Sequence, residues 1–423
     1  MTKFFVALIV ICQLWLGPAH AQFRVDVSGV GLTQLPISVA SFRGQAATGV
    51  QTADIVLADL ERSGQFRGIT APPGAMDELT VPNLSVSRQS GADALVLGSV
   101  TPLADGRFDV RFRLWDVVKG QDLGGHSYAV GRADLRLAAH RIADYVFEKL
   151  TGDKGVFSTR IAYVTKNGPR YQLWVSDADG ESAQAALSSP EPIISPAWSP
   201  DGNQLAYVSF ESRKPVIYVH NVSTGKRRLL ANFRGSNSAP AWSPDGKTLA
   251  ATLSKEGGSQ LFLLSPDVGE PRKLTQSGGI DTEPVFSSDG RFIYFVSDRG
   301  GAPQVYRMLV SGQGVERVTF TGSYNISPAL SADGRWLAYI SRVGAAFKLY
   351  LMELATGTVR ELTATSADES PSFAPNSKLL MYATRQQGRE ALMTTTLDGK
   401  VKAQLSGQGG DLREPDWGPF FNP

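Results

Sequence analysis

The feature that most constrains this chain is a repeat with a nearly fixed period. The segment 195–202 reads SPAWSPDG, and it returns at 239–246 as APAWSPDG. Related segments begin at four later prolines, Pro284, Pro328, Pro371 and Pro415. Successive prolines of the series are 44, 44, 44, 43 and 44 residues apart. A fixed period of this length indicates one supersecondary unit stacked on copies of itself.

Each copy of the repeat predicts four short strands. The first strand carries the proline and an aromatic residue, and a turn such as 200–202 (PDG) joins it to a β-rich second strand such as 205–209. Proline presets φ for this turn, and glycine accepts the positive φ that the turn requires. A third strand with an aromatic or aliphatic pair and a fourth strand after a glycine turn complete the unit. Four strands in such a period are typical of one blade of a β-propeller.

The copies are circularly shifted along the chain. The last proline strand lies at 415–417, whereas three strands without a proline strand before them lie at 160–164, 172–175 and 185–187. We therefore expect a six-bladed β-propeller over 156–423, in which strands from the N- and C-terminal ends of the ring share one blade. Such closure removes free sheet edges, which would otherwise invite aggregation.

The most regular residues of the repeat are expected to be structural. The aromatic residues should pack between blades: Trp198, Trp242, Phe286, Phe373 and Trp417. The aspartates of the turns are expected to be turn residues rather than metal ligands, because they sit in four different blades: Asp201, Asp245, Asp289 and Asp333.

The first 21 residues have the pattern of a signal peptide. Lys3 precedes an apolar run over 4–16, and 19–21 (AHA) is a cleavage motif, so we expect export and cleavage after Ala21. Cys12, the single cysteine, lies in the removed segment, which excludes a thiol nucleophile, a disulfide and a cysteine-ligated metal in the mature chain. The net charge of +2 argues against nucleic acid as a partner.

Residues 34–152 lack the repeat. Apolar residues at helical spacing predict helices near 50–60 and 135–150, and apolar or alternating runs predict strands at 94–100 and 108–114. Mixed helices and strands in this length indicate a small α/β domain. The expected fold is therefore a two-domain chain, α/β followed by an all-β propeller. The short segment 22–33 precedes it, and its residues alone favour an edge strand of the α/β domain over a detachable recognition peptide.

The sequence offers no catalytic constellation. The mature chain has three histidines, His126, His140 and His220, and no two of them are spaced as a metal pair. His140 follows the helical pattern beside Arg141 and is expected at or near the surface. No nucleophile elbow, phosphate loop or dinucleotide fingerprint is present. We therefore predict no enzyme activity, no metal and no cofactor, with a propeller-containing hydrolase or a small-ligand binding protein as the alternatives.

Binding is expected at one mouth of the propeller channel. The loops that lead into the first strand of each blade are polar and vary between blades, while the strand framework stays constant. Varied loops on a fixed scaffold are where recognition is expected. Acidic residues predominate there, which favours a partner that offers Lys or Arg. The residues that we expect at the mouth are Ser236, Asn237, Ala239, Asp281, Thr282, Glu283, Asn325, Asp368, Glu369, Arg413 and Glu414.

The order of these parts resembles a known family. A signal peptide, a short tail that begins Phe23-Arg24-Val25, a small α/β domain and six PxWSPDG-type blades are similar over the whole chain to TolB, the periplasmic component of the Tol–Pal system. The resemblance implies a non-enzymatic protein that binds the lipoprotein Pal of the outer membrane and the inner-membrane protein TolA. It also implies a role in outer-membrane integrity and in constriction at division. Other outer-membrane proteins are possible further partners, and contact with membranes is expected through partners only.

The resemblance also assigns the binding segments. Pal is expected at the channel mouth, where Ser236, Ala239 and Thr282 match the family's contact positions by motif. TolA is expected to bind the tail 22–33, which replaces the interpretation of this tail as an edge strand of the α/β domain. The TolA-binding residues are Gln22, Phe23, Arg24, Val25, Asp26, Val27, Ser28, Gly29 and Val30. The tail is expected to be either docked on the body or exposed, and Pal binding would bias that choice.

Overall fold

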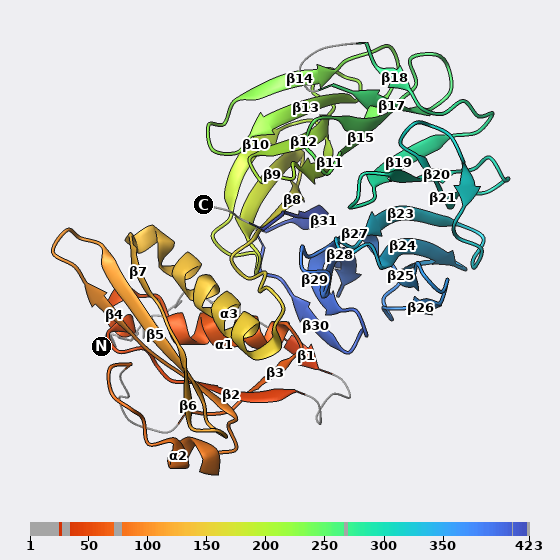
Figure 1. The fold of residues 1–423 in the computed structure, drawn as a ribbon. Coiled ribbons are helices and arrows are strands. Elements are labelled where there is room, and N and C mark those ends of the chain that lie inside the picture. The colour runs from red at the N-terminus through yellow and green to blue at the C-terminus, as the bar shows by residue number, and fades with distance from the viewer. Residues whose placement is uncertain (1–24, 28–33, 72–77, 266–269, 408, 421–423) are drawn as a thin grey trace, which may run out of the picture.

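The structure is a computed structural model, and it describes residues 25–27, 34–71, 78–265, 270–407 and 409–420. It shows a small α/β domain beside a ring of β-sheets, with α1 (Thr52–Arg62) and α3 (Leu135–Thr151) lying between the α/β sheet and the ring (Figure 1). The fold class expected from the sequence is confirmed. The predicted signal peptide lies outside the described residues.

The α/β domain is built on a mixed sheet in the order β3-β2-β4-β5-β6, with β7 also paired to β5. Its strands are β2 (Leu35–Val39), β3 (Phe66–Gly68), β4 (Ala94–Pro102), β5 (Phe108–Asp116), β6 (Gln121–Gly124) and β7 (Ser127–Val130). Besides α1 and α3, the helices are η1 (Gln45–Thr48), α2 (Leu84–Gln89) and η2 (Arg132–Asp134).

The two long helices exist because each carries one apolar stripe. Ala53, Val56 and Leu60 of α1 are buried against the stripe of α3 and the sheet. Apolar side chains at this spacing lie on one face of a helix, and burying that face provides most of a helix's stability in a protein. The α3 helix ends at Gly152, whose φ of +82° allows its N–H to donate to the carbonyl of Glu148.

The ring consists of six four-stranded blades, one of which carries an additional strand. Blade 1 is β11 (Ile193–Trp198), β12 (Gln204–Ser209), β13 (Val216–Asn221) and β14 (Arg227–Ala231). Blade 2 is β15 (Asn237–Trp242), β16 (Leu249–Leu253), β17 (Gln260–Leu264) and β18 (Arg272–Lys273). Blade 3 is β19 (Asp281–Phe286), β20 (Phe292–Ser297), β21 (Gln304–Leu309) and β22 (Glu316–Arg317). Blade 4 is β23 (Asn325–Leu330), β24 (Trp336–Val343), β25 (Ala346–Glu353) and β26 (Val359–Glu361). Blade 5 is β27 (Glu369–Phe373), β28 (Leu379–Gln386), β29 (Arg389–Thr396) and β30 (Val401–Gln404).

Blade 6 combines the two ends of the ring, as the circular shift of the repeat predicted. The last strand, β31 (Asp411–Trp417), pairs antiparallel with β8 (Arg160–Asn167), which is followed by β9 (Arg170–Asp177) and β10 (Gln184–Ser189). The indole N–H of Trp417 donates to the Thr159 hydroxyl over 2.8 Å. The closing strand is thereby tied both to blade 6 and to the residue that precedes β8.

The repeated residues have the structural roles expected of them. Trp198 of blade 1 packs against Ala162 and Leu173 of blade 6, and Phe373 of blade 5 packs against Ile340 of blade 4. In each Pro-Asp-Gly turn the aspartate accepts a hydrogen bond from the preceding serine hydroxyl and from a backbone N–H two residues later. In blade 1 these are Ser199 to Asp201 at 2.5 Å and the N–H of Asn203 to Asp201 at 3.0 Å. The turn aspartates therefore hold local backbone in place.

The described part of the tail, β1 (Val25–Val27), is a fifth strand on the outer edge of blade 5. It pairs antiparallel with β30, with Val25 opposite Ala403 and Val27 opposite Val401. The interpretation of the tail as an edge strand of the α/β domain is therefore wrong for these residues. The α/β sheet ends at β3 on one side and at β6 and β7 on the other, whereas the outer edge of β30, close to α1, is taken by β1.

None of the helices in the described part of the chain combines the length and the hydrophobicity that a membrane span requires.

Deleting 411–423 should open the ring. The deletion leaves β8 without its inner neighbour and leaves blade 5 without the aromatic contact from Trp417. We expect loss of the single cooperative calorimetric transition and formation of oligomers on gel filtration. A chain trimmed only at 421–423 is the control. A monomer with the parental melting temperature after the longer deletion would contradict this dependence on closure.

Candidate functional site at the channel mouth

A ring of strained backbone surrounds the mouth of the channel. The residue before each repeated proline has a left-handed φ between +48° and +51°, although none of the six is glycine. These residues are Ser195, Ala239, Glu283, Ser327, Ser370 and Glu414. The first strand of every blade has a β-bulge at this point, where its register against the second strand shifts. Bulges re-aim side chains and often occur beside functional sites.

Two of these six residues are glutamates that bridge neighbouring blades. Glu283 Oε2 of blade 3 accepts a hydrogen bond from the N–H of Ser327 in blade 4 over 2.6 Å. Glu414 Oε2 of blade 6 accepts one from the N–H of Ser195 in blade 1 over 3.3 Å. Burial raises the pKa of both carboxyl groups, and the charge of Glu283 raises that of Glu414 further. The charge of Glu283 therefore acts on the carboxyl group of Glu414 within the channel.

Four of the expected mouth residues do not face a partner, which corrects the sequence interpretation. Asn237, Asp281 and Asn325 are fully buried, and Asp368 is 2% exposed. Each bonds its own mouth loop: the carboxamide of Asn237, for example, accepts from the N–H of Phe233 at 2.9 Å and donates to the carbonyls of Phe233, Gly235 and Pro215.

The sequence did contain the signal for this role. All four residues stand three positions before a repeated proline, so they share the fixed period of the structural residues. They shape the mouth loops from inside. The other expected residues, Ser236, Ala239, Thr282, Glu283, Glu369, Arg413 and Glu414, are all half-buried at the mouth.

Acidic groups dominate the side of the channel formed by blades 5 and 6. Burial, together with the charges of Glu414 and Glu390, raises the pKa of Glu369 to about 7. Burial also raises the pKa of Asp416, deeper on β31, to about 6. Arg413 is paired with Glu390. The mouth thus holds carboxyl groups that a nearby cation would ionise.

A pocket of about 320 Å³ opens beside Glu369, between blades 4 and 5. Ile326, Ile340 and Phe347 form an apolar wall, and Glu369, Arg385 and Glu390 lie on the polar side. A wall of this kind suits the alkyl stem of a lysine or arginine, while its charged end meets the glutamates.

Sequence reasoning missed an exposed apolar arc on the same rim. Ile280 is 54% exposed in the mouth loop of blade 3, and Phe320 is 74% exposed in that of blade 4. Val343, in the hairpin between β24 and β25, is 47% exposed. These residues occur once rather than in every repeat, so the period does not mark them. A large apolar residue inside a polar loop was the available signal.

The histidines lie away from the mouth. His220 is buried on β13, and His126 is exposed between β6 and β7 of the α/β domain. His140 is completely buried between the two domains, which contradicts its expected place at or near the surface. It is buried because the helical stripe of α3 continues onto a face covered by the propeller. The described residues therefore bring no histidine to the channel mouth.

Comparison with known proteins agrees with this architecture. Residues 147–421 match the family described as the TolB beta propeller domain, and residues 23–123 match the TolB amino-terminal domain. A relative from Polaromonas sp. (strain JS666 / ATCC BAA-500), named Tol-Pal system protein TolB, is 80% identical over 405 residues, covering 96% of this chain and 95% of the relative. The chain belongs to the TolB family.

More distant TolB relatives also align with nearly the whole of this chain. A Tol-Pal system protein TolB from Dechloromonas aromatica (strain RCB) is 61% identical over 405 residues, covering 96% of this chain and 95% of the relative. The crystal structure of TolB from Acinetobacter baumannii superposes with a TM-score of 0.86 at 38% identity, covering 94% of this chain and 100% of that one. As a TolB family member, the chain is a component of the Tol–Pal system.

Replacing Glu369 with glutamine should stabilise this TolB protein in a pH-dependent way. Because the pKa in the folded state lies above the ordinary value, the wild type loses stability as pH rises from about 4.5 to about 7, and the variant does not. We expect the variant's advantage in free energy of unfolding to grow over that range to on the order of 1–2 kcal/mol, reduced because the group meets solvent. Urea denaturation at several pH values measures it, with the exposed Glu148→Gln as control. An advantage that is constant with pH would contradict the raised pKa.

Proposed function

We propose that this protein is a periplasmic, non-enzymatic scaffold of the Tol–Pal system. In this proposal it binds Pal through the channel mouth and TolA through the tail 22–33, and it thereby supports outer-membrane integrity and constriction at division. The proposal rests on two features that occur in the same protein. One is an acidic, partly apolar channel mouth, and the other is a short tail strand docked on the edge of a blade.

The chemistry of the mouth supports a protein partner. It offers exposed apolar side chains at Ile280 and Phe320. It also has a pocket whose glutamate carboxyl groups would be stabilised in their ionised form by an incoming cation. Apolar anchors surrounded by polar groups are the usual composition of a protein–protein interface. Pal would place a basic side chain against Glu369 and apolar side chains against the arc of Ile280, Phe320 and Val343.

The docking of the tail supports a detachable recognition segment. The described strand makes only three residue pairs with β30, at the outer edge of blade 5. A strand added to a sheet edge is held mainly by main-chain hydrogen bonds, and the same bonds are available to another edge. The tail could therefore exchange its place on β30 for a place on TolA at modest cost.

A non-enzymatic role agrees with the placement of the reactive side chains. Of the mouth carboxyl groups with raised pKa values, Glu283 and Glu414 accept hydrogen bonds from backbone N–H groups, and Glu369 is influenced by the charges of Glu414 and Glu390. No histidine of the described residues stands beside them. Removal of the predicted signal peptide would place the mature chain in the periplasm.

Replacing Ile280 and Phe320 together with serine should weaken Pal binding about tenfold or more, because both apolar contacts are lost. Leu309→Ser with Val315→Ser is the matched control, since these residues are 37% and 39% exposed at the turn between the third and fourth strands of blade 3. That turn lies beside Arg291, on the rim opposite the mouth. Isothermal titration with purified Pal measures the affinity. Equal effects of the two pairs would exclude the mouth as the Pal site.

Deleting 22–33 should abolish TolA binding and leave Pal binding within about threefold. The deletion removes the proposed TolA segment, while the mouth lies on other elements. Pull-down and titration with the soluble part of TolA measure the effect, and a chain with 22–33 in scrambled order controls for the length of the tail. Retained TolA binding by the deleted chain would refute the assignment of the tail.

A further inference from the structure

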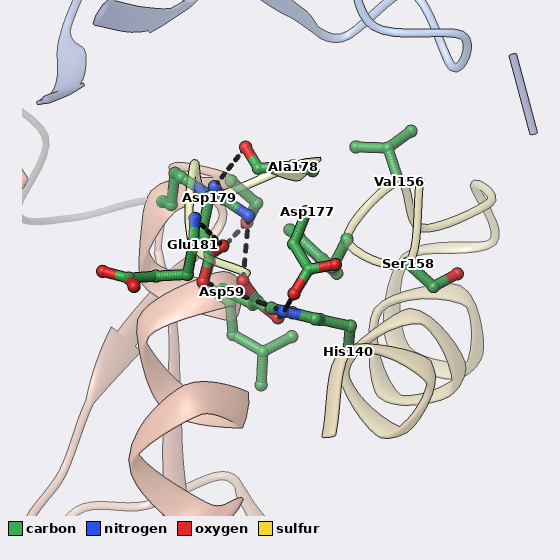
Figure 2. Close-up of polar contacts among 12 residues, drawn as sticks. Asp59, His140, Val156, Ser158, Asp177, Ala178, Asp179 and Glu181 are labelled. Atoms are coloured by element: carbon green, nitrogen blue, oxygen red, sulfur yellow. Dashed lines mark hydrogen bonds and ion pairs between the residues drawn. The ribbon is translucent and has the colours of Figure 1, made fainter. Parts of the chain in front are cut away.

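A buried group of charged side chains lies between the α/β domain and blade 6. His140 of α3 is fully buried, and Asp59 and Arg62 of α1 are each 2% exposed. His140 Nδ1 lies 2.6 Å from Asp59 Oδ2, and Arg62 Nη2 lies 2.9 Å from Asp59 Oδ1. Figure 2 shows the His140 ring between Asp59 and Asp177. This group accounts for the burial of a residue type that the sequence placed near the surface.

The propeller contributes the turn between β9 and β10 to the same group. His140 Nε2 lies 3.7 Å from carboxylate oxygens of both Asp177 and Asp179. Arg62 donates to the carbonyl of Ala178 over 2.8 Å, and Arg136 of α3 contacts Asp179 at 2.5 Å. Each cationic side chain of the α/β domain in this group thus reaches the same turn of the propeller.

The formal charges balance only if His140 carries a proton on both ring nitrogens. Asp59, Asp177 and Asp179 contribute three negative charges, while Arg62 and Arg136 contribute two positive charges. An isolated buried charge is costly, so an unbalanced group would be unfavourable. Burial opposes protonation, but Asp59, Asp177 and Asp179 raise the pKa of His140 to about 10.

Asp144 of α3 is a fourth carboxyl group near Asp59, whose charge raises the pKa of Asp144, but the groups that donate hydrogen bonds to Asp144 lie outside this cluster. Asp144, one turn further along α3, accepts hydrogen bonds from the backbone N–H groups of Phe157 and Ser158, and burial raises its pKa to about 6. For Asp179, burial would raise the pKa, but His140, Arg136 and Arg62 hold it below its ordinary value.

A metal ion is the competing explanation for this geometry. Ligand atoms of Asp59, His140 and Asp179 lie within 4.8 Å of one another. A divalent ion would displace the proton of His140 and leave the group with one excess positive charge. It would also compete with Arg62 and Arg136 for the carboxylates. The proton therefore fits the group better than a divalent ion does.

The turn from the propeller is also joined to the segment that follows the tail-binding strand. The N–H of Ser406, two residues after β30, donates to the carbonyl of Asp179 over 3.0 Å. Gly180 packs so closely here that a Cβ atom would lie 1.7 Å from the carbonyl oxygen of Ser406. On the other side, a Cβ atom at Gly64, two residues after α1, would lie 3.0 Å from a methyl carbon of Val401 of β30. The charged group, α1 and β30 are thus in one continuous contact.

We propose that this group is an ionic joint, with His140 as an imidazolium, that fixes the α/β domain on the propeller and keeps β30 in position to hold the tail. His140 is then a positioning residue for tail docking. The inference does not depend on which proteins bind the tail or the mouth. Its failure would leave the proposed function standing, and the reverse is also true.

The protonation state can be measured on the unmodified mature protein. Nitrogen NMR of the imidazole should show both nitrogens of His140 protonated and unchanged from pH 5 to 8.5. His220 is buried, and burial and the charge of Arg227 lower its pKa, so it should be neutral at the upper end of that range. A neutral His140 at pH 8 would overturn the proposal, and this measurement does not depend on whether any variant folds.

The role in tail docking is tested by a charge-balance cycle. His140→Gln leaves the group with one excess negative charge, so backbone amide exchange at 25–27 should become at least about tenfold faster. Adding Asp59→Asn restores the balance and should recover most of the protection, which a loss of packing alone would not do. His220→Gln is the matched control for loss of a buried histidine. Unchanged exchange in a folded His140→Gln protein, or no recovery in the double variant, would refute the joint.

Zinc titration of the wild type completes the test. We expect no stoichiometric binding that is lost in His140→Gln. Stoichiometric binding that requires His140 would instead assign the group to a metal and overturn the proposal.

Discussion

The pairing of β31 with β8 is the contact on which the other parts of the molecule depend. It joins strands separated by nearly the whole propeller sequence, so the ring exists only when both ends of that sequence are in place. It also positions the α/β domain, because α3 ends shortly before β8 begins and Thr159 in the connection bonds Trp417 of the closing strand. Closure therefore fixes the ring and its neighbouring domain by one interaction.

One stretch of chain, 401–417, leads from the strand that carries the tail to residues at the channel mouth. It begins with β30, which carries the tail, continues through Ser406, which touches the turn at Asp179, and ends in β31, which places Arg413 and Glu414 at the mouth. The contacts of β30, Ser406 and β31 therefore follow one another within a short stretch of the sequence.

The fold could be predicted from the sequence because the residues that build each blade recur once in every repeat and can be recognised by that period. Trp198, Asp201 and their counterparts recur with the period, and their roles in packing and turns follow from their chemistry. Asn237 and Asp281 obey the same period, yet their polar side chains suggested a binding surface, since burial of a hydrogen-bonded polar group cannot be read from residue type. His140 shows the other limit. Its environment depends on a turn of another domain, and no local pattern records that contact.

The two groups of buried charge in this protein are resolved in opposite ways. Around His140 every carboxylate has a cationic partner within the chain, so the group gains nothing from an outside ligand and holds two domains in a fixed relation. At the mouth, the charge of Glu414 acts on Glu369 and the charge of Glu283 acts on Glu414, and despite Arg413 the pKa of all three glutamates stays raised, so their ionisation is opposed. A cation from a partner would relieve that opposition, because it stabilises the charged form of these groups. Burying charged carboxyl groups is unfavourable in both places. Around His140 the chain's own cations offset that cost and the two domains are held together, whereas at the mouth it is left for a bound partner to offset.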